Sequence, residues 1–244
     1  MMVPDVNTTV RELALEMPQA TRVFEKLGID YCCGGRRSLE EACAVAGVDL
    51  SHVQQSLEVA AKMKSRSGDG VNLQKATLGE LIGHILEEHH QFTRQELVRL
   101  AGLMAKVCSV HKLNHPELVA QQYLLHELES DLLPHMKKEE LTLFPYIISM
   151  EKAIAHHGRK PEAPFVAVRN PVRMMSIEHD RVGGLLREMR RLTSDYTVPL
   201  DGCDSYWTLF LALEGFEKDL HRHIHLENNL LFPRAIKLES SWDM

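Results

Sequence analysis

Two segments of the chain share a pattern of histidine, glutamate and proline that can bind metal. HMKKEELTLFP runs from residue 135 to residue 145, and HIHLENNLLFP runs from residue 223 to residue 233. In both segments a glutamate follows the first histidine by four residues, at Glu139 and at Glu227. Residues four apart lie on one face of an α-helix, so each segment can direct an imidazole and a carboxylate toward one point.

A further histidine precedes each segment at nearly the same distance, which indicates an internal duplication. His90 lies 45 residues before His135, and His179 lies 44 residues before His223. In an antiparallel bundle, residues equally far from a turn lie at the same level. The midpoints between successive histidines fall in or beside breaks in the helical pattern that contain proline or glycine or both, near residues 112, 157 and 201. The spacing therefore predicts an up-down-up-down four-helix bundle with all four histidines in one layer.

Four imidazoles and two carboxylates exceed the ligands that one tetrahedral zinc ion takes. The set suits two metal ions that share Glu139 and Glu227 as bridges, with two histidines on each ion. Nitrogen and oxygen ligands with open coordination positions favour iron, and manganese next. A single His-Glu pair is common on helix surfaces, but its duplication with matching partners favours a metal centre.

The first histidine of the layer has a rival in its neighbour. His89 lies nearer the middle of the apolar stripe of its helix, whereas His90 matches the spacing of the second half more closely. Carboxylates that can orient the imidazoles are Glu88, Asp131, Glu140 and Glu178, and a solvated helix face is an equal alternative for Glu88 and Glu140. The other histidines considered lie outside the layer or in turns: His84, His111, His115, His126, His156, His157, His221 and His225.

Cys32 and Cys33 stand side by side in the stretch DYCCGG. A disulfide between adjacent residues closes a strained ring, so the pair indicates redox chemistry or metal handling. Gly34 and Gly35 predict an exposed, flexible turn that presents both thiols to a partner or to iron. The alternative is a pair of small buried residues in a helix contact. Packing roles are expected for the remaining cysteines, Cys43, Cys108 and Cys203.

Helical periodicity along the chain predicts an all-α protein. Short patterned pieces, with expected helix caps at Thr9, Ser38 and Asp49 or Ser51, predict a small helical domain over residues 1–64. The polar, glycine-containing stretch 65–75 is typical of a linker. A bundle domain over residues 76–240 is expected to contain four long helices, at 76–110, 116–155, 172–196 and 203–238.

The composition argues against several classes of protein. A net charge of −6 gives no support for nucleic-acid binding, and no apolar run is long enough to span a membrane. The N-terminal residues lack the pattern of a signal peptide. Five cysteines without framework spacing are typical of a reducing compartment, so we expect a cytoplasmic protein.

Taken together, DYCCGG, EEHH, EHD and the two duplicated segments resemble the RIC family, the di-iron proteins for repair of iron centres. The resemblance covers nearly the whole chain. It implies a hemerythrin-like bundle and a non-haem di-iron centre with four histidines and two bridging glutamates, here His90, His135, His179, His223, Glu139 and Glu227. The stretch DLLPH, residues 131–135, departs from the family pattern and leaves the role of Asp131 open.

The resemblance also implies repair of iron–sulfur clusters after nitrosative or oxidative stress. In this hypothesis the bundle supplies iron to damaged iron–sulfur proteins or to an assembly scaffold, and Cys32 and Cys33 take part in the transfer. An enzymatic alternative is a di-iron nitric oxide reductase that forms nitrous oxide, and the same residues are compatible with both. A third is a hemerythrin-type protein that binds or senses nitric oxide or dioxygen, which would not need the cysteine domain.

Overall fold

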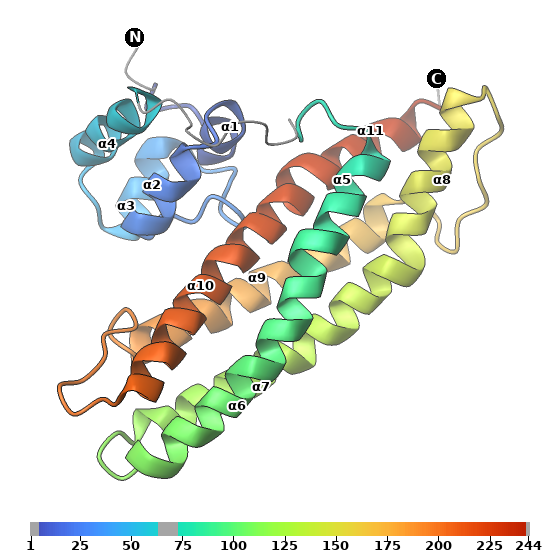
Figure 1. Ribbon diagram of the computed structural model, residues 1–244. Coiled ribbons are helices and arrows are strands. Elements are labelled where there is room, and N and C mark those ends of the chain that lie inside the picture. Colours follow the sequence, from blue (N-terminus) through green and yellow to red (C-terminus); the bar gives the residue numbers. More distant parts are fainter. Residues whose placement is uncertain (1–4, 63–72, 243–244) are drawn as a thin grey trace. The chain divides into compact units, whose positions relative to one another are not determined.

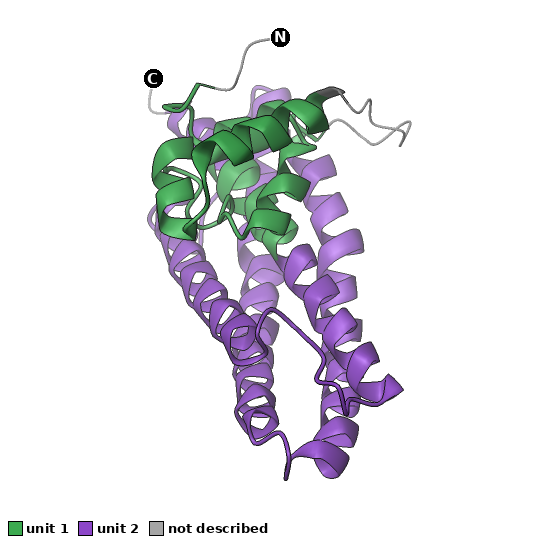
Figure 2. Cartoon of the chain, turned by 90° about the vertical axis from the view of Figure 1, so that its left-hand side faces the viewer, with its two compact units in different colours: residues 1–77, 221–233 green, residues 78–220, 234–244 purple. Residues whose placement is uncertain are grey.

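The computed structural model describes residues 5–62 and 73–242, which form helices and connecting turns without an extended strand. They divide into two compact units, residues 1–77 with 221–233 and residues 78–220 with 234–244 (Figure 2). The predicted all-α class is confirmed. Residues 65–72, most of the expected linker, lie outside the described part of the chain.

The N-terminal part of the first unit consists of four short helices (Figure 1). They are α1 (Val10–Glu16), α2 (Ala20–Leu27), α3 (Leu39–Ala46) and α4 (Leu50–Lys62). Thr9 and Ser38 each cap a helix through a reciprocal capping box. The Asp49 carboxylate accepts a hydrogen bond from the backbone N–H of His52 at 2.8 Å, in the first turn of α4. The predicted caps at Thr9, Ser38 and Asp49 are therefore confirmed.

Four antiparallel helical runs form the bundle (Figure 1). Three runs contain a π-helical turn, labelled η. The first run is α5 (Leu78–His84), η1 (Ile85–His90) and α6 (Gln91–His111), and the second is α7 (Glu117–Lys138), η2 (Glu139–Leu143) and α8 (Phe144–Ala155). The third is α9 (Arg169–Leu192), and the fourth is α10 (Asp204–Leu226), η3 (Glu227–Leu231) and α11 (Phe232–Ser240). The predicted up-down-up-down bundle is confirmed.

Helix α9 differs from its predicted range, 172–196, at both ends. It begins at Arg169 and contains Pro171 in its first turn, where a missing N–H breaks no helical hydrogen bond. It ends at Leu192, because three of the next residues adopt the left-handed backbone region that α-helices exclude. These are Ser194, Asp195 and Tyr196, with φ of 47°, 58° and 56°.

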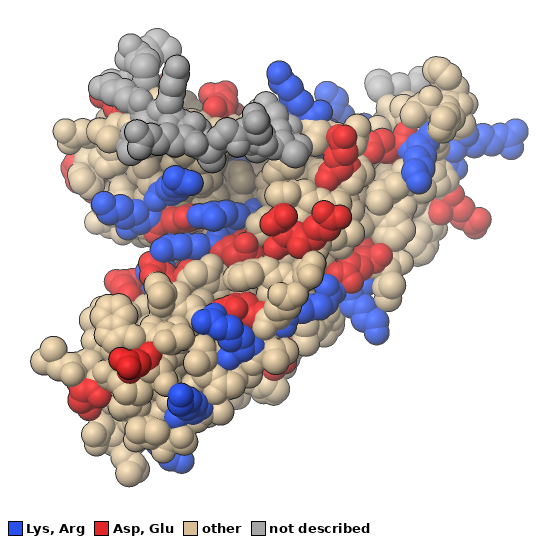
Figure 3. All heavy atoms as spheres, viewed as in Figure 1, with Lys and Arg blue, Asp and Glu red and all other residues tan. Residues whose placement is uncertain are grey.

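Two properties of the described residues are the apolarity of their helices and the charges on one face. None of these helices combines the length and apolarity of a membrane span. On the face drawn in Figure 3, lysine and arginine side chains lie among aspartate and glutamate side chains.

An ion pair whose carboxylate is buried and whose arginine is partly exposed joins α9 to α10. Arg190 donates from Nε to Glu217 Oε1 at 3.1 Å and from Nη2 to Oε2 at 2.8 Å. Its guanidinium carbon also lies 5.0 Å from the centroid of the Tyr196 ring. The Glu217 residue is only 3% exposed, so the carboxylate depends on the arginine to offset its loss of hydration.

We expect Glu217→Ala to lower the free energy of unfolding by about 2 kcal/mol, because it removes two charge-assisted hydrogen bonds and leaves Arg190 with Asp195 as its remaining carboxylate partner. Glu217→Gln should cost less, since one hydrogen bond to the guanidinium can remain. Urea unfolding of the metal-free protein, followed by circular dichroism, measures both effects.

The matched control is Glu214→Ala on the same helix. Glu214 pairs with Lys218 at 2.6 Å, but both side chains are 37% exposed. Exposed helical pairs contribute about 0.5 kcal/mol or less. Equal losses in the Glu217→Ala and Glu214→Ala proteins would contradict a stabilising role for the pair of Arg190 and Glu217.

Candidate metal centre

The three π-helical turns lie at the level of the predicted ligands. Glu139 is the first residue of η2, Glu227 is the first of η3, and His90 is the last of η1. The Phe144 N–H binds the carbonyl of Glu139 and the Phe232 N–H binds that of Glu227, five residues back in each case. Such turns recur at functional sites, where they change the direction of side chains within a helix.

The repeated Leu-Phe-Pro explains two of these turns. Pro145 and Pro233 have no N–H, and a proline ring clashes with the carbonyl four residues before it in a regular helix. Each proline is the second residue after the wider turn of η2 or η3, which displaces the carbonyls ahead of it. The motif at the end of each duplicated segment thus favours a π-helical turn that begins at a glutamate.

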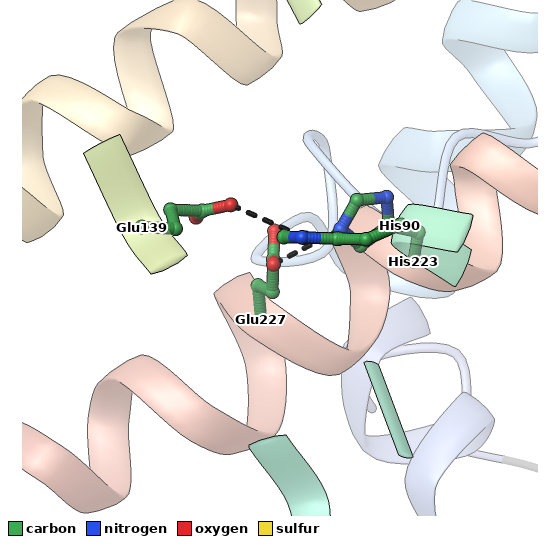
Figure 4. A group of neighbouring side chains, drawn as sticks. All are labelled: His90, Glu139, His223 and Glu227. Carbon is green, nitrogen blue, oxygen red and sulfur yellow. Dashed lines mark hydrogen bonds and ion pairs between the residues drawn. The ribbon is translucent and has the colours of Figure 1, made fainter. Parts of the chain in front are cut away.

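Six buried side chains meet in two overlapping groups. One group is His90, Glu139, His223 and Glu227 (Figure 4), and the other is His135, Glu139, His179 and Glu227. Within each group, one ligand atom from every residue lies within 4.8 Å of all the others. Both glutamates belong to both groups. All six residues named from the sequence are therefore brought together.

The separations within the groups are those of side chains that converge on a common centre. Glu139 Oε2 lies 3.4 Å from both His90 Nε2 and His135 Nε2. His223 Nε2 lies 3.0 Å from Glu227 Oε1, and His179 Nε2 lies 3.0 Å from His135 Nε2. Two carboxylates in a dry interior repel each other and are costly to bury without cations. The donor set therefore fits bound divalent metal ions.

Carboxylates on the outer side fix the orientation of two imidazoles. His90 Nδ1 lies 2.7 Å from Glu140 Oε1, which also accepts a hydrogen bond from Arg94 at 2.5 Å. His135 Nδ1 lies 2.7 Å from Glu178 Oε2, and Lys138 binds the other oxygen of that carboxylate. A carboxylate only accepts, so each Nδ1 carries the proton and the lone pair of Nε2 faces the centre.

Both outer carboxylates are ionised at neutral pH. Burial acts to raise the pKa of Glu140, but hydrogen bonds from Arg94 and His90 outweigh it and leave the pKa below its ordinary value. Burial acts in the same way on Glu178, and Lys138 and His135 lower its pKa. The sequence indicated both glutamates as candidates. It did not identify Arg94 and Lys138, the cations that keep them ionised.

His89 points to a different partner. Its Nδ1 lies 3.0 Å from Asp219 Oδ1 on α10, and its ring packs edge-on against His84. The apolar pattern favoured His89 because it assumes a constant helical period, whereas both histidines lie within the wider turn of η1. The structure places His90, and not His89, beside Glu139.

Two of the four carboxylates considered as orienting groups lie elsewhere. Glu88 is exposed. Asp131 Oδ2 lies 2.6 Å from Arg181 Nε on α9. Asp131, whose role the sequence left open, therefore pairs with an arginine.

The expected exposure of the cysteine turn is wrong for Cys32. This residue is 4% exposed, and Cys33 is half-buried. Asp30 Oδ1 accepts the backbone N–H of Cys32 at 3.2 Å and that of Cys33 at 2.9 Å, and the two Sγ atoms lie 3.8 Å apart. The hydrogen bond with Cys33, together with burial, raises the pKa of the Cys32 thiol well above its usual value.

The two glycines of this turn serve close packing and not flexibility. Neither has a positive φ. A Cβ on Gly35 would lie 2.8 Å from the Tyr31 carbonyl oxygen and 3.2 Å from Arg11 Cβ, and one on Gly34 would lie 3.0 Å from the Asp30 carbonyl oxygen. A side chain at Gly35 would therefore displace the turn from its neighbours.

The cysteine turn is bound to the helical segment that carries two of the predicted ligands, His223 and Glu227. Asn229 Nδ2 donates to the Tyr31 carbonyl at 3.1 Å, and Arg11 donates to the Asn229 carbonyl at 3.0 Å. Arg222 adds two bonds to Glu25, both at 3.0 Å. Sequence patterns could not reveal these contacts, because they join residues about 200 positions apart.

Two family models match the chain. A domain of unknown function, ScdA_N, matches residues 6–61, and the hemerythrin HHE cation-binding domain matches residues 81–235. The second model agrees with buried histidine and glutamate groups that could hold metal ions.

Curated relatives match over nearly their full length. The iron–sulfur cluster repair protein YtfE of Dickeya chrysanthemi is 36% identical over 96% of this chain and 98% of the relative. A probable iron–sulfur cluster repair protein of Haemophilus influenzae is 32% identical, over 92% and 95%. The repair protein ScdA of Staphylococcus haemolyticus is 30% identical, over 93% and 96%. The chain therefore belongs to the family of iron–sulfur cluster repair proteins that join a ScdA_N domain to a hemerythrin HHE cation-binding domain.

Proposed function

We propose that the chain holds two iron ions in the buried histidine and glutamate groups and supplies iron to iron–sulfur clusters damaged by nitrosative or oxidative stress. The observation that carries this proposal is that Glu139 and Glu227 belong to both groups of ligand atoms. Two shared carboxylates match a pair of ions bridged by both. The names of the curated relatives support the repair function.

In this proposal one iron ion takes His90 and His223, and the other takes His135 and His179. Each ion then has two imidazoles and two shared carboxylates, fewer than the six positions of an octahedral ion, so positions stay open. Bound iron would supply the metal that a damaged cluster has lost. Glu140 and Glu178 hold the imidazoles of His90 and His135 in the tautomer that binds metal.

The recipients would be damaged iron–sulfur proteins or an assembly scaffold in the cytoplasm. Cys32 and Cys33 would carry iron between the centre and the recipient. Their two thiols and the carboxylate of Asp30 offer ligand atoms within 4.8 Å of one another. We assign residues 1–64 to the cysteine domain, 65–75 to a linker and 76–240 to the di-iron bundle.

Removal of both bridging groups should empty the centre. After anaerobic purification we expect about two iron ions per parent chain, as two-metal sites hold. The Glu139→Ala, Glu227→Ala double variant should contain few or none, because each ion loses both shared oxygens. Elemental analysis measures the content, and circular dichroism checks that the variant is helical. Equal iron in the two proteins would overturn the assignment.

Substitution of the two neighbouring histidines separates the candidate ligand from its rival. His90→Ala should lower iron content and weaken binding of the remaining iron by at least tenfold, because an imidazole is lost from one ion. His89→Ala removes a buried ring bound to Asp219 and should leave the iron content near that of the parent. The reverse order of effects would assign the ligand to His89.

Loss of the two thiols should stop transfer but not metal binding. The Cys32→Ser, Cys33→Ser variant should retain its iron and fail to restore the absorbance of a nitric oxide-damaged iron–sulfur protein. Cys43→Ser is the matched control, since Cys43 is a buried packing residue of the same domain. Transfer at the parent rate by the double variant would exclude the thiols from this step.

A further inference from the structure

A second cluster of metal-binding side chains lies where the α6–α7 turn faces the α9–α10 loop. His111 is the last residue of α6, and His115 follows it by one helical turn. Asp201 and Cys203 lie just before α10. His115 Nε2 is 2.9 Å from Asp201 Oδ1, and His111 Nε2 is 3.3 Å from Cys203 Sγ. Ligand atoms of both histidines and of Asp201 lie within 4.8 Å of one another.

The two imidazoles are held with Nε2 toward the opposite loop. Glu117 Oε1 lies 3.2 Å from His115 Nδ1, an arrangement that metal-binding histidines commonly share. The ring of Tyr206, which is buried, lies behind both imidazoles, with centroids 5.3 Å from His111 and 5.7 Å from His115. The cluster is therefore ordered by its own surroundings before any ion binds.

The sequence interpretation assigned no role to this cluster. It placed His111 and His115 outside the ligand layer and expected Cys203 to be a packing residue. The structure contradicts the expectation for Cys203, because this residue is exposed and its thiol faces an imidazole. A hydrogen bond with His111 lowers the pKa of this thiol to about 7.

We propose that His111, His115 and Asp201 bind one divalent cation such as zinc, and that Cys203, whose thiol contacts His111, moves in as the fourth ligand. Two imidazole nitrogens, one carboxylate oxygen and one thiolate are the ligand types of four-coordinate zinc. In tetrahedral zinc the ligand atoms lie about 3.3–3.6 Å apart. The 3.3 Å between His111 Nε2 and Cys203 Sγ matches this range, and the 2.9 Å between His115 Nε2 and Asp201 Oδ1 must widen slightly. A thiolate and the lack of a shared carboxylate distinguish this site from the iron centre.

The proposed ion would have a structural role. It would join the turn after α6 to the loop before α10, and so tie two connections of the bundle together. The site does not depend on the proposed iron centre. His111 follows His90 by the whole length of α6, 21 residues, which corresponds to about 32 Å along the helix.

Zinc titration of the iron-loaded protein tests the proposal. The protein is loaded with ferrous iron without oxygen, freed of excess iron, and titrated with Zn²⁺ against a chromophoric chelator. We expect the parent to bind about one Zn²⁺ per chain with unchanged iron content, and the Cys203→Ser, His115→Ala variant to bind it at least tenfold more weakly. Substitution of Zn²⁺ by Co²⁺ should give a thiolate charge-transfer band that Cys203→Ser abolishes.

Two further proteins serve as controls. His126→Ala removes an exposed histidine of the same bundle and should bind Zn²⁺ like the parent. The Glu139→Ala, Glu227→Ala variant should also retain Zn²⁺, so failure of the iron centre and failure of this site are distinguishable. The proposal is overturned if Zn²⁺ enters the parent only by displacing iron, or if the Cys203→Ser, His115→Ala variant binds Zn²⁺ as tightly as the parent.

Discussion

Two carboxylates in the buried interior are the constraint around which the bundle is arranged. Glu139 and Glu227 are fully buried, and ligand atoms of both lie within 4.8 Å of one another. Like charges at this separation repel strongly, and bound cations offset that repulsion. Four imidazoles face the two carboxylates, and outer carboxylates fix the orientation of two of these rings. Both features favour the binding of divalent ions between the glutamates.

The π-helical turns also help to bring the buried histidines and glutamates together. A constant α-helical period would direct His89 inward. The wider turn of η1 rotates the following side chains around the helix axis, so that His90 faces Glu139. In the other two runs a proline follows the wider turn and keeps the helix from returning to the regular hydrogen-bond pattern there. The bridging glutamates thus start turns whose local sequence disfavours an ordinary helix.

Much of this arrangement was predictable from spacing along the chain. The duplicated motif and the midpoints between histidines identified the bundle, its turns and the six converging side chains, because helix periodicity is a local property. Other features depend on contacts between distant segments. The burial of Cys32 depends on packing around its turn. The contact of His115 with Asp201 joins two residues that are 86 positions apart. No local pattern encodes either one.

The attachment of the cysteine turn to Asn229 has a thermodynamic consequence. Outward movement of the turn must break the hydrogen bond from Asn229 to the Tyr31 carbonyl. Asn229 lies two residues after Glu227 in the sequence. If Glu227 holds an ion as proposed, opening of the turn and binding of that ion would be linked equilibria, and linkage is reciprocal. Movement of the turn away from Asn229 would then weaken binding of the ion, and departure of the ion would ease that movement.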